Sequence, residues 1–283
     1  MPKIHVVTDS GSDLPKSVRD QYNIHVVPLS IQFGEDIYKD GVELNADDFY
    51  RILTEAAVLP STCQPSPADF VKCYESIAEP GDAIISVHLS SKLSGTYQSA
   101  VLASTMVSRR QIHVLDTKAA SIGIGLVALA VAEAVQNGAS VEEALAVGEK
   151  VVDELQVYFV VDTLEYLKRN GRIGAASALV GSLLNIKPVL TLDNGIVAPY
   201  DKVRGKAKAL NRIFGLLQDY VKAHPQRRIR VGITHANCID EALQLRDKIY
   251  EQLKIDDIII EYIGPTIGVH VGPGTIALLW YPM

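Results

Sequence analysis

A predicted strand is joined to a predicted helix by the segment His88-Leu89-Ser90-Ser91-Lys92-Leu93-Ser94-Gly95-Thr96-Tyr97-Gln98-Ser99-Ala100. Residues 82–87, just before it, form a short apolar run with β-branched side chains, which is typical of a buried strand. Residues 97–107 carry small and apolar side chains without Gly or Pro, and they favour a helix. The connection between the two, residues 90–96, is rich in hydroxyls and contains one glycine and one lysine.

This connection has the composition of an anion-binding loop. Gly95 allows the backbone to come close to a ligand, and the start of a helix presents unpaired N–H groups with partial positive charge. Such a place suits a carboxylate or a phosphate. Alternatively, Ser94 only caps the helix, and the two interpretations are compatible because a cap and an anion use the same donors.

Composition and charge limit the class of protein. The chain has 283 residues, of which 48% are hydrophobic, enough for two well-packed domains. Its net charge of −6 gives no general attraction to nucleic acid. The N-terminal residues run directly into a predicted strand without a signal-peptide pattern, and the three cysteines are scattered. We therefore expect a cytoplasmic protein without a disulfide framework.

Strands and helices alternate along the chain. Strands are predicted at residues 4–8, 23–33, 82–87, 112–115, 157–161, 229–234, 258–262 and 275–280, with a hairpin at Asn194-Gly195. This order predicts two α/β domains, residues 1–156 and 157–283, with mainly parallel sheets flanked by helices. Loops are predicted at residues 59–65 and 264–274, and Ser12 or Asp13 is expected to cap the first helix.

Ligands of such sheets bind beyond the carboxyl ends of the strands. The loops at residues 8–13, 61–64 and 90–96 lie at or beside strand ends and are rich in hydroxyls, so we expect them to meet at one crevice in the first half of the chain. The sequence shows no histidine spacing typical of a metal site and predicts no cofactor. Residues 123–128 match G-x-G-x-x-A, but they lie inside an apolar helical run and indicate helix packing, not a dinucleotide site.

Two further side chains allow both a functional and a plain structural interpretation. His270 is surrounded by glycines, which suggests that the backbone passes close to something, but a histidine in a turn has the same pattern. Arg172 follows Lys168 and Arg169 and is either an exposed basic turn or a contact for a phosphate or an acidic partner.

Taken together, the motifs resemble the DegV family nearly from end to end. The residues that carry the resemblance are Thr8-Asp9-Ser10, Ser12-Asp13-Leu14, Ser61-Thr62-Cys63-Gln64-Pro65, residues 90–97, Gly171-Arg172-Ile173, His270 and Gly272-Pro273-Gly274. The resemblance implies that one long-chain fatty acid is held between two domains. It also implies the role of the fatty-acid-binding subunit of a bacterial fatty acid kinase, the FakB type. There, a separate ATP-using partner protein phosphorylates the bound carboxylate, and the acyl phosphate feeds phospholipid synthesis.

The resemblance also implies roles for particular residues. Thr62 and Ser94 would hydrogen-bond the carboxylate, together with the loop residues Gly95 and Thr96, and His270 would belong to the network around the head group. Arg172 would face the kinase partner. No residue of this chain would be catalytic on its own, and a lipid carrier of this kind is compatible with transient membrane contact.

Two other functions remain open on the residues alone. The chain could be a hydrolase or acyltransferase with Ser94 as nucleophile and His270 as base, although it lacks a nucleophile elbow and an obvious orienting acid. It could also be a module that binds a sugar or a small anion, because hydroxyl-rich loops do not by themselves specify a ligand.

Overall fold

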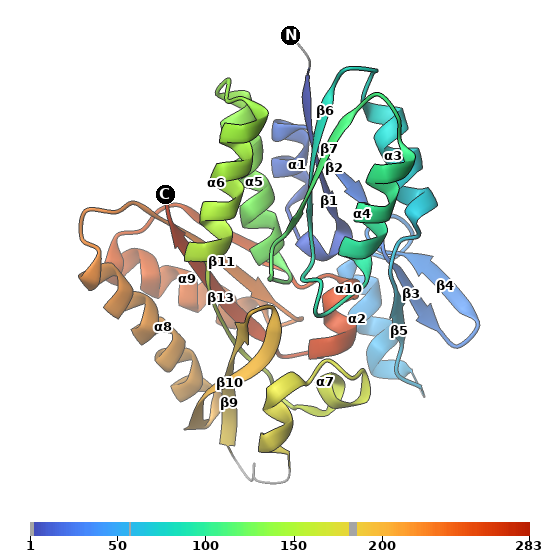
Figure 1. The fold of residues 1–283 in the computed structure, drawn as a ribbon. Coiled ribbons are helices and arrows are strands. Elements are labelled where there is room, and N and C mark those ends of the chain that lie inside the picture. The colour runs from blue at the N-terminus through green and yellow to red at the C-terminus, as the bar shows by residue number, and fades with distance from the viewer. Residues whose placement is uncertain (1–2, 57, 181–185) are drawn as a thin grey trace.

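The first half of the chain contains a four-stranded parallel sheet in the order β2-β1-β6-β7. The structure is a computed structural model that describes residues 3–56, 58–180 and 186–283. Helices cover both faces of this sheet, with α3 and α4 on one side and α1, α5 and α6 on the other (Figure 1). The predicted parallel sheet is confirmed here. The elements are β1 (Ile4–Asp9), β2 (Ile24–Val27), β6 (Ala83–His88), β7 (Gln111–Asp116), α1 (Lys16–Tyr22), α3 (Pro67–Ile77), α4 (Thr96–Met106), α5 (Ile122–Gln136) and α6 (Val141–Glu154).

A small antiparallel sheet, β4-β3-β5, stands beside the parallel one and contains β3 (Ser30–Phe33), β4 (Asp36–Lys39) and β5 (Ser61–Cys63). The predicted strand at residues 23–33 is therefore wrong, because it is two strands in different sheets. Pro28 lies between them and has no N–H to donate to a sheet. The predicted loop at residues 59–65 also contains a short edge strand, β5. The Asn45 side chain accepts a hydrogen bond from the Asp48 N–H and caps α2 (Ala46–Glu55).

The second half forms a six-stranded mixed sheet in the order β10-β9-β8-β13-β11-β12. The prediction of mainly parallel strands is wrong here, because only β11 and β12 pair in parallel. The turn Asn194-Gly195 forces β9 and β10 to be antiparallel, and the last strand, β13, lies between β8 and β11 and is antiparallel to both. The strands are β8 (Gln156–Val160), β9 (Ile186–Asp193), β10 (Ile196–Arg204), β11 (Ile229–His235), β12 (Ile258–Tyr262) and β13 (Ile276–Pro282).

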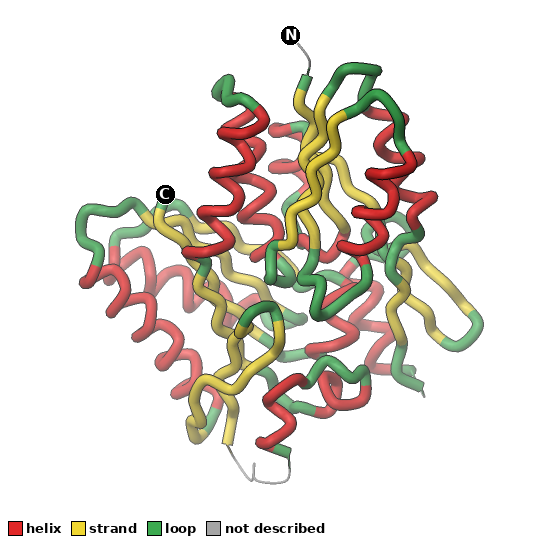
Figure 2. The backbone as a smooth tube through the Cα atoms, viewed as in Figure 1, coloured by secondary structure: helices red, strands yellow, loops and turns green. Residues whose placement is uncertain are grey.

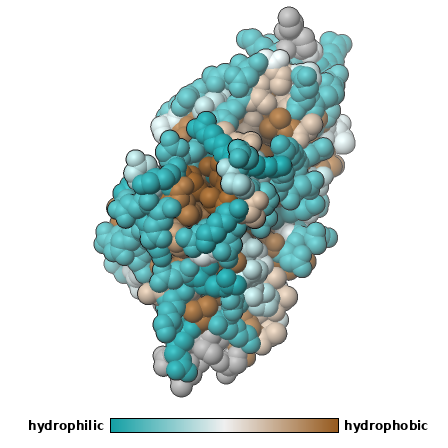
Figure 3. Space-filling model, turned by 90° about the vertical axis from the view of Figure 1, so that its left-hand side faces the viewer, coloured by the Kyte–Doolittle hydropathy of each residue, from teal (hydrophilic) through white to brown (hydrophobic). Residues whose placement is uncertain are grey.

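Helices α5 and α6 separate the two large sheets, while α8 (Lys206–Ala223) and α9 (Ile239–Leu253) cover the outer face of the second sheet (Figures 1 and 2). The predicted packing role of residues 123–128 is confirmed: a Cβ on Gly123 would lie 3.0 Å from the Leu279 side chain, and one on Gly125 would lie 2.7 Å from the Leu14 side chain. None of the described helices is long and apolar enough to span a bilayer. Hydrophilic side chains cover most of the face drawn in Figure 3 and surround an apolar hollow.

The predicted loop at residues 264–274 is largely a helix, α10 (Pro265–Val271), which was missed because its glycines suggested a loop. Gly268 instead permits close packing, since a Cβ there would lie 2.7 Å from the Phe49 ring of α2.

Pro15, not Ser12 or Asp13, occupies the N-cap position of α1. Asp13 accepts a hydrogen bond from the Gly264 N–H immediately before α10.

Helix α10 belongs to the second half of the chain but packs against α2, β3 and β5 of the first half and against α7 (Glu165–Arg169). Residue 156 begins β8, the first strand of the six-stranded sheet. The division into domains 1–156 and 157–283 stays a prediction, and α10 crosses the line between them.

Candidate functional site

A cavity lies between the loops at the carboxyl ends of the parallel strands and the inner face of the six-stranded sheet. Most of its wall is apolar and comes from β8, β9, β10, β13, α10 and the loop after β6, including Leu89, Leu93, Phe159, Leu192, Ile267 and Leu279. The two halves of the chain therefore enclose one space that suits an apolar ligand.

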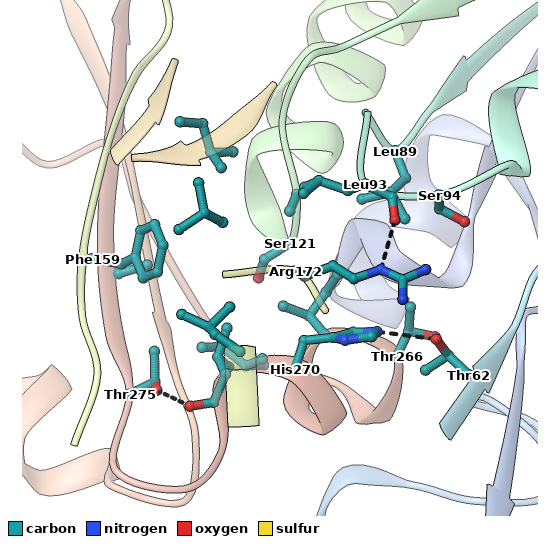
Figure 4. A pocket seen from close by; sticks show the side chains of 18 of the residues that line it. Thr62, Leu89, Leu93, Ser94, Ser121, Phe159, Arg172, Thr266, His270 and Thr275 are labelled. Atoms are coloured by element: carbon teal, nitrogen blue, oxygen red, sulfur yellow. Dashed lines mark hydrogen bonds between the residues drawn. The ribbon is translucent and has the colours of Figure 1, made fainter. Parts of the chain in front are cut away.

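Polar side chains gather on one side of this cavity. In Figure 4, Thr62, Ser94, Arg172 and His270 lie near one another, whereas Phe159 lies on the opposite side among mainly apolar side chains, and the hydroxyl of Thr275 on that side donates to the Val271 carbonyl. Thr62 comes from β5, Ser94 from the loop before α4, and His270 from the last turn of α10. The cavity thus has a polar end and an apolar end, which is the polarity of an amphipathic ligand.

Thr62 and His270 are joined by a hydrogen bond of 3.0 Å between Oγ1 and Nε2. Burial lowers the pKa of His270 to about 4, and the nearby positive charge of Arg172 acts in the same direction. The imidazole is therefore neutral at pH 7. Its Nδ1 is buried and has no hydrogen-bond partner in the described part of the chain.

The loop that carries Ser94 is held by its own backbone and by Ser90. The Leu93 and Ser94 N–H groups donate to the Ser90 carbonyl, and the Ser90 hydroxyl donates to the Gly195 carbonyl of the β9–β10 turn. The Ser94 hydroxyl bonds the Thr96 hydroxyl at 2.9 Å and accepts from the Thr96 N–H at 3.3 Å. The Ser94 hydroxyl therefore accepts from an N–H in the first turn of α4, and the same residue lines the cavity. The N-cap position itself is occupied by Gly95, which has no side chain to accept a hydrogen bond.

Gly95 and Thr96 do not line the cavity, which differs from the expectation that they contact a carboxylate there. Thr96 is fully buried beneath the loop. Gly95 lies under Gln64, because a Cβ on Gly95 would be only 2.1 Å from the Gln64 Oε1. The glycine thus permits the close approach of a protein side chain at this point.

Sequence reasoning missed four polar side chains of the cavity wall: Gln64, Ser121, Thr266 and Thr275. Gln64 lies in the hydroxyl-rich loop at residues 61–64, which is predicted from the sequence to lie at the crevice, so its position in that loop indicated a place in the wall. Ser121 has a φ of 54°, a conformation that costs energy for a residue with a side chain and that gathers at functional positions. Its hydroxyl donates to the Asp13 carboxyl group at 2.5 Å, and the Thr266 hydroxyl donates to the Asp40 carboxyl group.

Arg172 is exposed to solvent and also lines the cavity. Its Nε donates to the Leu93 carbonyl at 3.2 Å and its Nη1 to the Asn170 carbonyl at 2.8 Å. Within the described residues it forms no ion pair. The guanidinium therefore sits at the mouth of the cavity and joins the loop after α7 to the loop before α4.

The predicted nucleophile–base pair is not formed among the described residues. The Ser94 hydroxyl bonds Thr96, and the His270 Nε2 bonds Thr62. A serine hydrolase needs its serine within hydrogen-bond reach of the base. Nor do the His, Cys, Asp and Glu side chains that the structure describes form groups of three or more that could hold a metal ion.

A family model described as "Uncharacterised protein, DegV family" matches residues 3–283. The chain belongs to the DegV family. The protein DegV of Bacillus subtilis (strain 168) is 37% identical over 279 residues, which is 98% of each chain. The crystal structure of DegV from Bacillus subtilis, described as a fatty acid binding protein, covers 100% of both chains at 35% identity and a TM-score of 0.92.

A DegV family protein of Thermus thermophilus, whose structure is described as showing fatty acid binding, has a TM-score of 0.92 at 37% identity and covers 99% of this chain and 100% of its own. The predicted family and the DegV-like α/β fold are therefore confirmed. The elements that surround the cavity belong to a fold shared with DegV proteins that are described as binding fatty acids.

Proposed function

We propose that this DegV-family chain binds one long-chain fatty acid in the cavity, with the carboxylate at the polar end and the tail along the apolar wall. One observation carries the proposal: a largely apolar cavity with Thr62, Ser94 and His270 gathered on one side. The DegV relatives described as fatty acid binding proteins support it, because their folds match along the whole chain.

The tail supplies most of the affinity in this proposal. Burial contributes about 0.8 kcal/mol per methylene, so a chain of ~14 methylenes gains on the order of 11 kcal/mol before the costs of binding. A hydrogen bond to the carboxylate contributes roughly 1.5–3 kcal/mol. The head group therefore fixes the orientation of the ligand, while the apolar wall holds it.

The neutral state of His270 suits this head group. When Nε2 carries the proton, it donates to Thr62 Oγ1, and the Thr62 hydroxyl then has its own hydrogen free to donate to a carboxylate. Ser94 offers a second neutral hydroxyl. Neutral donors orient a carboxylate without neutralising it, so its oxygen keeps its negative charge for a later reaction.

That later reaction is phosphorylation by a separate ATP-dependent kinase in the cytoplasm. A carboxylate oxygen attacks the γ-phosphorus of ATP, the bond to the bridging oxygen breaks, and ADP leaves the acyl phosphate behind. Arg172, exposed at the cavity mouth, faces the kinase in this proposal. The chain itself presents the substrate and contributes no catalytic residue.

Mass spectrometry of lipid extracted from the purified protein tests the binding, and a long-chain fatty acid at about one per chain is expected. Thr62→Val keeps the shape but removes the hydroxyl, and it should weaken palmitate or oleate binding by roughly tenfold or more. Thr105→Val, on the exposed face of α4, is the matched control and should bind as the wild type does. An extract without fatty acid, together with no binding of either acid, would refute the proposal.

The kinase role needs a separate test. Arg172→Ala should lower the rate of acyl-phosphate formation by an added fatty acid kinase more than it lowers fatty acid affinity. Arg169→Ala is the control, because Arg169 is exposed nearby but pairs with Glu165. Equal losses of binding and turnover in Arg172→Ala would contradict the docking role.

A further inference from the structure

A second hollow, the side groove, lies between the two halves of the chain. It is lined by α1, β2, the turn after β4, the end of β12 and the start of α10. None of its described lining residues comes from the loop before α4 or the loop after α7, which carry Ser94 and Arg172. The side groove is therefore separate from the mouth of the cavity.

Only one layer of chain, the partition, separates the side groove from the cavity. It consists of residues 28–29 and 263–266. Neighbouring residues in each segment face opposite sides: Leu29, Ile263 and Thr266 line the cavity, and the others line the side groove. A small displacement of either segment would therefore connect the cavity with water.

Two buried carboxyl groups hold the partition closed. Asp40, which is 4% exposed, accepts hydrogen bonds from the N–H and the hydroxyl of Thr266. Asp13, which is 9% exposed, accepts from the Gly264 N–H at 3.0 Å and from the Ser121 hydroxyl at 2.5 Å. Both aspartates line the side groove, whereas Ser121 and Thr266 line the cavity. Each carboxyl–hydroxyl pair thus joins the water side to the ligand side.

Ionisation of these carboxyl groups is unfavourable while the partition is closed. Burial raises the pKa of Asp40 to about 6, and the charge of Asp9 in β1 acts in the same direction. Burial also raises the pKa of Asp13, and the charges of Asp40 and of Glu261 in β12 add to this effect. Neither Asp13 nor Asp40 forms an ion pair in the part of the chain that the structure describes.

The other titratable groups around the partition leave this repulsion in place. Tyr50 and Tyr262 are neutral at pH 7, since the pKa of each phenol is raised, mainly by burial in Tyr50 and by a neighbouring carboxylate in Tyr262. Burial and a second histidine lower the pKa of His25 in β2. Lys16 pairs with the aspartate one turn later in α1, and the charge of Arg19 acts on the glutamate of β12.

We propose that the partition is a second access route for the fatty acid, which opens when the start of α10 moves away from Asp13 and Asp40. This inference rests on the proposed function. In the open state, water from the side groove solvates the two carboxyl groups, so ionisation favours opening and protonation favours closure. The route therefore loosens as pH rises and tightens as pH falls, without a change at the mouth.

The pKa of Asp40 sets the size of this effect. It is about 6 in the closed state, and contact with water in the open state should return it to 3.8. The closed state thus holds a proton that the open state has lost between these two pH values, and closure weakens as pH rises through them. Linkage between opening and ionisation then predicts an open population that grows about tenfold from pH 5 to pH 7.

Amide hydrogen exchange measures the opening. The Gly264 and Thr266 amides should exchange faster in the wild type than in Asp40→Asn, by a ratio that grows about tenfold from pH 5 to pH 7. Taking the ratio at each pH cancels the pH dependence of exchange itself. Asp20→Asn removes an exposed charge from the same groove and should match the wild type. The amides of residues 93–94, at the mouth, should show no such ratio.

Release of palmitate to acceptor vesicles shows whether the ligand uses this route. The release rate of the wild type divided by that of Asp40→Asn, taken at each pH to cancel titration of the fatty acid, should also grow about tenfold from pH 5 to pH 7. Asp13→Asn provides the same comparison if Asp40→Asn does not fold, because the pKa of Asp13 is raised as well.

The two measurements separate the ways in which the inference could fail. If the exchange ratio is independent of pH, the two carboxyl groups do not control the partition. If exchange follows pH but release does not, the start of α10 opens without passing the ligand, and the access route is refuted while fatty acid binding stands. Failure of palmitate to bind the wild type would instead refute the proposed function and the access route with it.

Discussion

His270 shows how single residues set the chemistry of the polar end. Burial and the charge of Arg172 lower the pKa of its imidazole to about 4, so the ring is neutral at physiological pH. The only hydrogen bond of the ring within the described chain goes to Thr62, and that bond decides which way the threonine hydroxyl points. A small change of charge near the ring should therefore be visible in its titration.

We predict that the His270 resonance titrates with a midpoint near pH 4 in ligand-free protein, measured by NMR of histidine-labelled samples. Bound fatty acid should raise the midpoint, because a nearby carboxylate favours the imidazolium. Arg172→Ala should raise it as well, since a neighbouring positive charge is removed, whereas Lys168→Ala serves as the control. An unchanged midpoint on fatty acid binding would place the carboxylate away from His270.

At the scale of elements, α10 is held at its start by two buried carboxyl groups. Asp40 accepts from the backbone N–H of Thr266 at 3.3 Å and from its hydroxyl, and Asp13 accepts from the Gly264 N–H at 3.0 Å. Burial raises the pKa of Asp40 from 3.8 to about 6, and it raises the pKa of Asp13 as well. The helix that carries His270 is therefore attached through groups that are hard to ionise.

Asp40→Asn tests this attachment. Between pH 3.8 and about 6 the folded protein holds a proton on Asp40 that the unfolded chain has lost, so this group makes the wild type less stable as pH rises through that range. The asparagine side chain does not titrate, so the stability of the variant relative to the wild type should rise with pH by up to roughly 3 kcal/mol. Urea unfolding of both proteins at pH 4 and pH 7 measures it. A difference that is independent of pH would show that the pKa of Asp40 is not shifted.

The elements that sequence patterns predicted well are those with local signals. Asn194-Gly195 marked its hairpin, because this signal depends on a few neighbouring residues. The caps at Asn45, Ser66 and Ser140 are local in the same way, since each side chain accepts from an N–H three residues along the chain. Helix α10 was missed because a short segment with internal and flanking glycines carries little helical signal. It is fixed by tertiary contacts with Phe49 and Asp40, which no local window contains.

At the scale of the whole molecule, strand direction was likewise predictable only where the sequence signal was local. The parallel sheet was predictable from alternating strands and helices, but the insertion of β13 between β8 and β11 joins segments that are far apart in sequence. For the same reason, only part of the candidate site could be predicted from the sequence. Thr62, Ser94 and His270 were expected together from the family resemblance, whereas Ser121 joins the wall only because α5 lies between the two sheets.

An ion cluster joins the six-stranded sheet to the C-terminal part of helix α5. Arg230 of β11 bonds Glu133 of α5 at 2.8 Å and Asp257 at 2.9 Å, and its side chain is only 9% exposed. Arg212 forms a comparable pair with Asp201, at 2.8 Å, but its side chain is 39% exposed. The two arginines therefore differ chiefly in burial and in what they connect.

Arg230→Met should lower the free energy of unfolding by about 3 kcal/mol, because it leaves the largely buried Glu133 without its cation and Asp257 with only Arg228, whose Nη2 lies 3.7 Å away. Arg212→Met should cost less than about 1 kcal/mol, since water solvates the remaining Asp201. Urea unfolding at pH 7 measures both. Replacing Glu133 and Asp257 by Leu in the Arg230→Met background should recover most of the loss, because the cost comes from unpaired charges. Equal, small losses in the two arginine variants would mean that apolar packing, and not this cluster, holds α5 against the six-stranded sheet.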